Sequence, residues 1–435
     1  MNRLVTLMLI ILCALPFDAN AEELINKGET LTLERCIEIA MKMQPTMAAA
    51  VNTVTVNESR VGQAKSTYYP QINWSASYER IKSESGSSSN NVNSFLGSLD
   101  NDAYDRYATG FSLNQLIYDF GKTATQVKIQ NLSLDASRSD LTNTTDQTVF
   151  AVKQAYYGLV QAKYNVLVAE DTVKQTQQQL DQARGFYQVG TKPKFDVTQA
   201  EVNLSAAKLN LIRNENAFRI AKVILNNVMG VPDAPEYSID ETMLFLKYEI
   251  TLEDALSKAY QNRPDLQSLI FARQAAERGI ELAKTGYYPV LNGNAGYTWS
   301  GEEFPLDHGW NVGASVSFPL FSGFLTKYQV AEAKANLNVI KANEESLKQT
   351  VFLEVQEAYL TLRAAEDAIP TAKLRVEQAK ENLEIANGRY AAGVGNPLEV
   401  TDAEVGLANA RTSYIQALYV DKVAQASLEK AMGMR

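Results

Sequence analysis

Two patterns of hydrophobic and polar positions alternate along the chain. In four short segments, apolar and polar side chains alternate one by one, which predicts β-strands with two different faces. These strands are predicted near residues 70–81, 106–117, 289–300 and 309–319. Elsewhere apolar residues recur every three or four positions, which predicts long helices with heptad seams. These helices are predicted near residues 121–188, 194–229, 323–391 and 397–432. The fold class is therefore mainly α with a smaller β part.

The predicted helices are longer than those of ordinary globular domains. No proline occurs between Lys122 and Tyr187, and a helix over that stretch would reach roughly 100 Å. We expect Pro370 to interrupt and kink the corresponding second helix. Asn214 and Asp421 are polar at corresponding seam positions. They either fix the helix register or face an aqueous space.

The sequence contains an internal repeat. Tyr68-Tyr69-Pro70 recurs as Tyr287-Tyr288-Pro289, and Met229-Gly230 recurs as Met432-Gly433. A polar loop at 82–91, with no counterpart in the second copy, accounts for the difference in spacing. We therefore expect a first repeat at 22–230, a linker at 231–250 and a second repeat at 251–435.

The first segment is typical of a secretory signal peptide. A short basic start, an apolar run from Leu4 to Leu15 and Ala19-Asn20-Ala21 predict cleavage after residue 21. A membrane anchor fits less well because the apolar run is too short to span a bilayer. The mature chain then keeps one cysteine, Cys36, which cannot form an intramolecular disulfide.

Composition excludes several classes of function. The net charge of -9 argues against nucleic acid as a partner. With two cysteines and one histidine, the chain cannot supply the usual zinc ligands. The one histidine, His308, falls in a stretch interpreted as a loop, 301–309, and no nucleophile, base or phosphate-binding loop accompanies it. We expect no enzyme, no cofactor and no metal.

The strands favour a membrane β-barrel over a half-buried sheet in a soluble sandwich. Each is about as long as a tilted strand that crosses a bilayer. One face carries tyrosine and tryptophan near its ends, and the other is small and polar. Four strands cannot close a barrel, and lipid does not tolerate open strand edges. At least two chains must therefore share one barrel.

These features together resemble the TolC family of outer-membrane efflux proteins. The resemblance rests on the repeated Tyr-Tyr-Pro, on Leu116-Ile117-Tyr118-Asp119-Phe120-Gly121 and Pro319-Leu320-Phe321-Ser322-Gly323, and on two helix-turn motifs. It implies a homotrimer with a twelve-stranded barrel in outer-membrane lipid and a helical tunnel through the periplasm. It also implies a passive exit duct for efflux or type I secretion, opened by a periplasmic adaptor and an inner-membrane pump of the RND or ABC type.

The resemblance places a gate at the two helix turns. Asp402 and Glu399 are neighbours on one helix face and would form a ring of six carboxylates in a trimer. Asp196 and Gln199 are their first-repeat counterparts. Tyr390, with its counterpart Tyr187, matches a tyrosine that ties the closed entrance. A basic residue found in some relatives is replaced by Gly395, and Lys192 or Lys194 is offered as a substitute.

Simpler explanations stay open for these residues. Asn396-Pro397-Leu398-Glu399 fits an ordinary helix start, so Glu399 serves either as a cap residue or as part of the gate. Tyr390 also fits plain seam packing. The expected adaptor-docking tips are also compatible with glycine caps. These tips are Val189, Gly190, Thr191, Gly393, Val394 and Gly395.

The sequence leaves the cargo open among drugs, metals, dyes and polypeptides. It also leaves one alternative function, a periplasmic coiled-coil adaptor or scaffold without a pore. The aromatic strand faces favour the duct, because an adaptor has no need for an apolar outward face.

Overall fold

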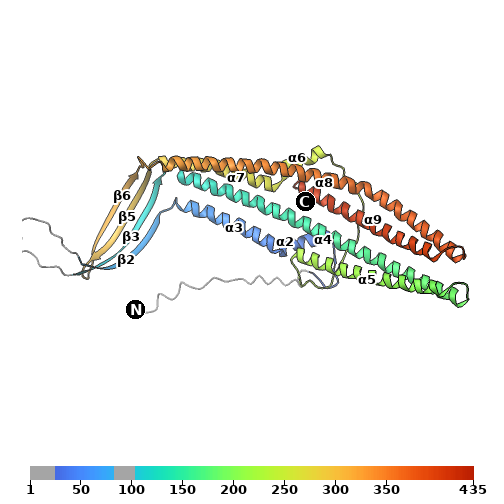
Figure 1. The fold of residues 1–435 in the computed structure, drawn as a ribbon. Coiled ribbons are helices and arrows are strands. Elements are labelled where there is room, and N and C mark those ends of the chain that lie inside the picture. The colour runs from blue at the N-terminus through green and yellow to red at the C-terminus, as the bar shows by residue number, and fades with distance from the viewer. Residues whose placement is uncertain (1–24, 83–102) are drawn as a thin grey trace, which may run out of the picture. The chain divides into compact units, whose positions relative to one another are not determined.

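A computed structural model describes residues 25–82 and 103–435 (Figure 1). The expected signal peptide, and the polar loop apart from its first residue, lie outside the described residues. The chain forms two compact units. The first combines the chain up to Ala50 with Thr142–Arg263 and Thr350–Arg435, and the second combines Val51–Leu141 with Pro264–Gln349. Each unit draws on both halves of the sequence, so the compact units cut across the expected repeats.

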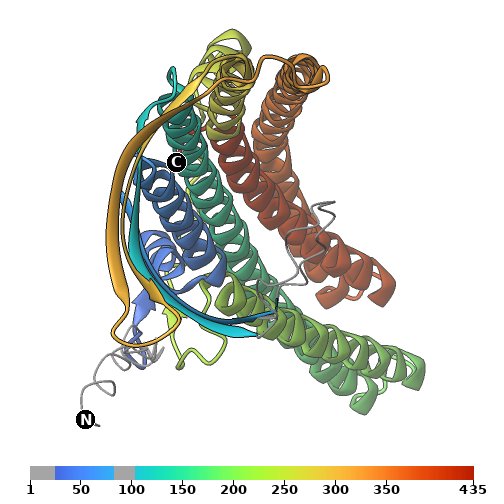
Figure 2. The same cartoon turned by 90° about the vertical axis from the view of Figure 1, so that its left-hand side faces the viewer.

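The second unit contains one four-stranded antiparallel sheet, which curves strongly (Figure 2). Its strands are β2 (Gln71–Ile81), β3 (Tyr104–Tyr118), β5 (Val290–Gly301) and β6 (Asp307–Ser317), in the order β2-β3-β5-β6. The central pair, β3 with β5, joins the first half of the sequence to the second.

The register separates the two faces of the sheet. Trp74 pairs with Phe111, Phe111 with Tyr297 and Tyr297 with Trp310, which makes one row of aromatic side chains. On the other face, one row runs Gln71, Asn114, Asn294 and Gly313. The alternation in the sequence therefore becomes an apolar and a polar face. Trp310 is 76% exposed within the single chain.

His308 does not lie in a loop. It is the second residue of β6, and its ring stacks on Tyr297 with centroids 6.0 Å apart. The expectation of a loop at 301–309 was wrong, because the strand begins before Gly309 and the true turn is confined to the residues between Gly301 and Asp307.

Short helices precede each strand pair, and the sequence patterns did not predict them. They are α2 (Leu33–Met43), α3 (Pro45–Ser66), α6 (Leu252–Asn262), α7 (Pro264–Lys284) and the 3₁₀ turn η1 (Thr285–Tyr287). Thr32 and Thr251 cap α2 and α6, since each side chain accepts a hydrogen bond from a backbone N–H of the first turn. Ser or Thr two residues before an acid was an available signal for these helix starts.

The long helices are α4 (Lys122–Gln188), α5 (Lys194–Met229), α8 (Leu325–Ala391) and α9 (Pro397–Ala431). Pro370 lies inside α8, which continues past it to Ala391, so the expected interruption was wrong. The expected kink stays a prediction. A proline removes one helical N–H, but Leu362, Ala365 and Ile369 are buried on the same helix. Their packing holds the turns before Pro370 in the helical conformation.

The two polar seam residues, Asp421 and Asn214, differ in burial and in hydrogen bonding. Asp421 is 1% exposed, so within the single chain it does not face an aqueous space, and burial raises the pKa of its carboxyl. Asn214 is half-buried and donates to the carbonyl of Asn210 in its own helix, at 2.9 Å. A role for Asp421 in fixing register stays a prediction.

The core of the first unit joins α2, α4 and α5 beside a two-stranded parallel pair, β1 (Thr30–Leu31) with β4 (Ser238–Ile239). β4 lies within the expected linker at 231–250. Gly230 and Gly433 end α5 and α9 with positive φ, and a Cβ there would lie 2.6 Å from the carbonyl oxygen of Met43 and 2.8 Å from the carbonyl carbon of Asn262. The repeated Met-Gly therefore ends a long helix against a short one in each half. No helix among the described residues is long and apolar enough to cross a membrane.

Candidate functional site at the helical-hairpin ends

Each hairpin of long helices, α4 with α5 and α8 with α9, turns at a glycine in the left-handed conformation. Gly190 has φ +77° and Gly393 has φ +78°. The Gly190 and Thr191 N–H groups donate to the carbonyls of Tyr187 and Phe186, each at 3.0 Å. The second turn repeats this pattern with Gly393 and Val394. Both are Schellman caps, so helix termination accounts for the two glycines whatever else the tips do.

Gly395 has a different reason to be glycine. A Cβ there would lie 2.8 Å from the backbone nitrogen of Tyr390, so the turn closes too tightly for a side chain. A basic residue is therefore sterically excluded at this position. Arg389, six residues earlier, places its Nε 3.3 Å from an oxygen of Glu399 across the α8–α9 turn.

The expected docking tips are exposed. Val189, just before Gly190, and Val394, just after Gly393, project apolar side chains into solvent. Phe195 and Leu398, at corresponding positions of the two hairpins, are exposed just beyond them. Isolated exposed apolar side chains are common, but these four gather at two helix ends. Their role in docking stays a prediction.

The start of α9 confirms the helix-cap geometry around Glu399. The Asn396 side chain accepts a hydrogen bond from the Leu398 N–H at 3.0 Å, and Pro397 opens the helix. Glu399 lies in the first turn, where a negative charge is favourable. Asp402 is exposed and forms no ion pair among the described residues. Its carboxylate is thus available for a gate, which stays a prediction.

Tyr390 connects the two hairpins. It is 4% exposed and packs edge-on against Phe186 of α4, with ring centroids 5.7 Å apart. Lys192, in the first turn, places its Nζ 5.5 Å from the centre of the same ring, a cation–π contact. Burial, and then the negative charge of Asp196, raise the pKa of Tyr390. Its counterpart Tyr187 is exposed.

A narrow crevice of about 20 Å³, lined by both polar and apolar side chains, lies between the two hairpins beside Tyr390. Asn203 of α5 donates to the hydroxyl of Thr401 of α9 at 3.0 Å, and Gln199 donates to Asn203 at 3.1 Å. Asp196 is buried in the lining of the crevice. The structure therefore brings Asp196, Gln199 and Tyr390 together, whereas Glu399 and Asp402 do not line this crevice.

Glu404 is a buried carboxyl residue that the sequence patterns did not single out. This residue of α9 is 5% exposed, and burial raises the pKa of its carboxyl to about 7. Its counterpart, Glu201, is exposed and bonded to Arg184 at 2.9 Å. The position that corresponds to Arg184 in the second half is Asn387. The loss of this basic residue was the available signal.

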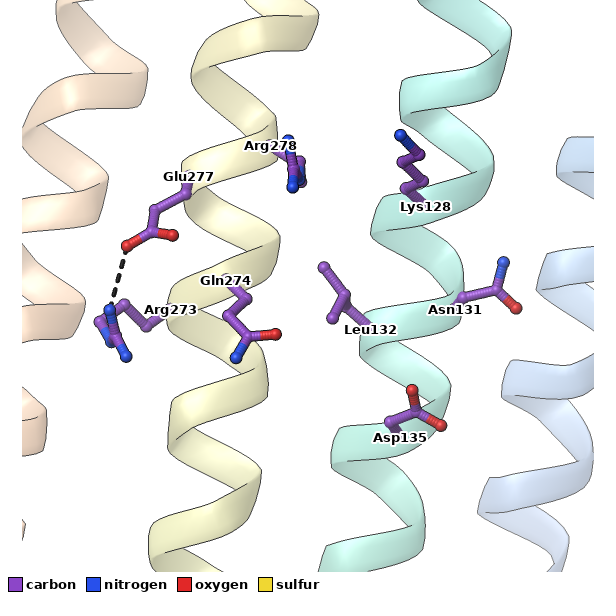
Figure 3. Close-up of a pocket in the computed structure, with 8 residues that line it drawn as sticks. All are labelled: Lys128, Asn131, Leu132, Asp135, Arg273, Gln274, Glu277 and Arg278. Carbon is purple, nitrogen blue, oxygen red and sulfur yellow. Dashed lines mark hydrogen bonds and ion pairs between the residues drawn. The ribbon is translucent and has the colours of Figure 1, made fainter.

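A second polar groove, of about 560 Å³, lies in the other compact unit between α4 and α7 (Figure 3). It is lined by Lys128, Asn131, Leu132, Asp135, Arg273, Gln274, Glu277 and Arg278. Arg273 and Glu277 pair at 3.1 Å. Charges of both signs alternate along this groove, which gives it no clear preference for an anion or a cation. No group of three or more potential ligand side chains is placed to hold a metal ion in the part of the chain that the structure describes.

Known proteins are similar to this chain along most of its length. The outer membrane efflux protein BepC of Brucella suis biovar 1 (strain 1330) is 22% identical over 407 residues, covering 92% of this chain and 85% of BepC. The outer membrane protein TolC of Escherichia coli (strain K12) is 23% identical over 398 residues, covering 86% and 76%. The crystal structure of the Campylobacter jejuni CmeC outer membrane channel superposes with a TM-score of 0.80 at 19% identity, covering 92% and 85%.

The family profile itself matches in two segments. The profile of the outer membrane efflux protein family covers residues 36–231 and 255–434. The relatives are outer-membrane channel proteins, and the mainly helical fold with its few strands matches theirs. The chain belongs to the outer membrane efflux protein family and is a protein of the outer membrane.

Proposed function

We propose that three copies of this chain form a passive outer-membrane exit duct for efflux or secretion. In this proposal four strands from each copy close a twelve-stranded barrel in outer-membrane lipid, and the long helices continue it into the periplasm. A periplasmic adaptor and an inner-membrane pump open the far end and supply the energy. No catalytic step, cofactor or metal is part of the proposal.

The observation that carries this proposal is the sheet with two faces and two free edges. Aromatic side chains stand on one face and small polar ones on the other, which suits lipid outside and water inside. Among the described residues, β2 and β6 each lack a neighbour on one side. Open edges are not tolerated in lipid, so β6 of one copy pairing with β2 of the next satisfies both.

In the first unit, α5 and α8 each carry a row of exposed apolar residues that no other helix of the described residues covers within the single chain. Exposed apolar residues recur at multiples of seven positions on α5 and on α8. They are Phe195, Val202, Leu209 and Val223 on α5, and Leu353, Leu360 and Leu374 on α8. Such seams pack against another helix rather than against water. A second copy of the chain supplies that helix when it also supplies the missing strand edge.

The gate is proposed at the hairpin ends. Three copies would bring Asp402 and Glu399 into one ring of carboxylates, which favours cations. Tyr390, held by Phe186 and Lys192, ties the second hairpin to the first. Lys192 rather than Lys194 makes this contact. This contact supports Lys192 as the proposed substitute for the basic residue that Gly395 replaces.

Single-channel conductance of the detergent-extracted protein in planar bilayers tests the proposal. We expect a cation-selective pore whose selectivity drops in the double variant Glu399→Ala/Asp402→Ala. The variant Asp181→Ala is the matched control, because it removes an exposed acid whose carboxylate accepts a hydrogen bond within its own helix. A pore indifferent to the double change would keep the duct and reduce both carboxylates to helix-start residues. Folded, inserted trimers without any conductance would contradict the duct.

A further inference from the structure

A cavity of about 620 Å³ lies on the polar face of the four-stranded sheet, at the end of the strands that adjoins the helices. Ser66, the last residue of α3, and Thr67 line one side of it. All of its lining residues belong to the second compact unit. We call it the amide cavity, because its other walls include the side chains of Tyr69, Gln71, Asn114, Asn292, Asn294 and Ser315.

The strand register gathers amide groups from three strands in this cavity. Gln71 of β2, Asn114 of β3 and Asn294 of β5 are consecutive register partners. Neighbouring strands are about 4.8 Å apart, so the three residues form a row about 10 Å long. Asn292 and Ser315 are partners in the next row on the same face. The cavity therefore presents two adjacent rows of groups that both donate and accept hydrogen bonds.

A glycine on the edge strand makes room for the Asn294 amide. Gly313 of β6 is the register partner of Asn294. A Cβ at Gly313 would lie 3.3 Å from Asn294 Oδ1 and 3.6 Å from Asn294 Nδ2. The amide therefore lies across the neighbouring strand, in the space that a side chain at Gly313 would fill. Because it lies there, it leaves the rest of the cavity open.

The asparagine amides of the cavity are not used within the protein. Gln71 Nε2 donates to the backbone carbonyls of Ser66 and Tyr69, at 3.2 and 3.3 Å, which holds the glutamine side chain in place. No such hydrogen bond engages any of the three asparagine side chains in the part of the chain that the structure describes. Each amide offers an acceptor oxygen and an NH₂ donor. Their hydrogen-bonding groups are thus available to a ligand.

The cavity has an aromatic wall and no charge. The Tyr69 side chain is 67% exposed and lines the cavity, and no lining residue carries a formal charge. The charged residues of the polar face, Glu79, Arg106 and Asp307, lie at the opposite end of the strands. A wall that only had to stay wet would need polar side chains, but neither the hollow nor the exposed ring.

This chemistry suits a neutral, hydroxyl-rich ligand. Sugar hydroxyls donate and accept hydrogen bonds, as amides and the serine hydroxyl do. The C–H face of a sugar ring packs on an aromatic side chain, which Tyr69 supplies. An ion would find no opposite charge in the lining. The cavity volume of about 620 Å³ falls within the range of ligand pockets, about 300–1,000 Å³.

We propose that the amide cavity binds a neutral saccharide. The Tyr69 ring and the amides of Asn114 and Asn294 are its two contact surfaces. The site is complete within one chain, so binding does not require assembly. Its role as a contact for passing cargo rests on the proposed function, in which the polar face lines the duct.

Ligand-observed NMR titration with maltohexaose tests the site. The full chain is extracted in an amine-oxide detergent, so that no detergent sugar competes. We expect Asn114→Leu/Asn294→Leu to weaken binding by about tenfold, because at least two net hydrogen bonds are lost. Asn73→Leu is the matched control, because it makes the same change on the same face outside the cavity, and it should leave the affinity unchanged.

The tyrosine gives a second test that does not depend on the folding of the double variant. Tyr69→Phe keeps the ring and should bind as the parent does, whereas Tyr69→Leu should bind several-fold more weakly. No binding of maltohexaose by the folded parent would overturn the site, and so would binding that the double variant retains. Equally tight binding of a charged oligogalacturonate, or displacement of the sugar by a neutral Gly-Ser peptide, would overturn the assignment to a neutral saccharide.

Planar-bilayer recordings separate the site from the duct. Saccharide binding in protein that conducts no current would keep the site and contradict the duct. Conduction by protein that binds no saccharide would keep the duct and overturn the site. If both hold, maltohexaose should reduce the current of the parent and of Asn73→Leu more than that of the double variant.

Discussion

The two helical hairpins have the same caps and the same seams but differ in what their seams bury. In the first, Leu180 and Ala183 pack against Ala200 and Leu204. In the second, Leu383 and Ala386 pack against Ala403 and Leu407, at positions that correspond one to one. Apolar packing is thus shared by both copies of the sequence.

The polar groups are not shared. The first hairpin keeps its glutamate, Glu201, exposed and paired with Arg184, and leaves Tyr187 in solvent. The second buries both counterparts, Glu404 and Tyr390. Repetition therefore maintains the scaffold, whereas the burial of this glutamate and this tyrosine is confined to the second copy.

The largest expected effect concerns the apolar seam packing that both hairpins share. Leu407→Ala and Leu204→Ala each remove a buried seam side chain, and each should lower the free energy of unfolding by about 2–5 kcal/mol. Denaturant unfolding followed by circular dichroism measures this. If one variant were far milder than the other, the two seams would not be equivalent.

The next largest effect concerns the glutamate that is buried in the second hairpin and exposed in the first. Because the pKa of Glu404 is raised, the folded state loses stability as pH rises from about 5 to about 8, by about 1–3 kcal/mol. Glu404→Gln should abolish this slope, and Glu201→Gln should leave it in place. Thermal unfolding at several pH values measures the slope. A slope that survives in Glu404→Gln would assign it to another group, with Asp421 the first alternative.

A smaller effect separates the two helix starts. Asn396 caps α9 with its side chain, whereas Pro193 offers α5 no such hydrogen bond. Asn396→Ala should therefore cost about 0.5–2 kcal/mol, and Pro193→Ala should remove no cap. Amide hydrogen exchange in the first turns of α5 and α9 localises the loss. Equal protection changes at the two starts would contradict it.

The smallest effect concerns the exposed pair. Arg184→Ala removes the partner of Glu201 in the solvated hairpin and should lower the free energy of unfolding by only about 0.2–1 kcal/mol.

The opposite change can be made in the second hairpin, where Asn387→Arg restores a possible partner for Glu404. It should reduce the pH slope of stability. An unchanged slope would show that residue 387 does not reach Glu404.

Much of this architecture could be predicted from the sequence, because long seams and alternating strands are strong periodic signals. The alternation of Ile72, Trp74 and Tyr78 identified the apolar face of β2. The eleven-residue helices α2 and α6 are strongly amphipathic and each has a threonine cap, so the sequence contained the signals that would have identified them. The interruption expected at Pro370 did not occur because helix propensity is local, whereas the buried residues around Pro370 hold α8 in the helical conformation.

The candidate site was only partly accessible from sequence. Asp196 and Tyr390 were identified, but their meeting with Lys192 depends on how one hairpin packs on the other, which no local pattern encodes. Glu404 was missed because glutamate beside an alanine seam usually faces solvent. Its burial depends on how the helices pack on one another, which the local sequence does not encode.

The pairing of β3 with β5 has a consequence for how the chain assembles. Gly110 and Thr298 are register partners, although the whole of both long helices of the first half, α4 and α5, lies between them in the sequence. Closing so long a loop is slow, and a two-stranded hairpin alone is only marginally stable in water. We therefore expect the sheet to be among the last parts to form. An emerging chain would then reach the far side of the inner membrane without a finished sheet, and would not insert into the first bilayer it meets.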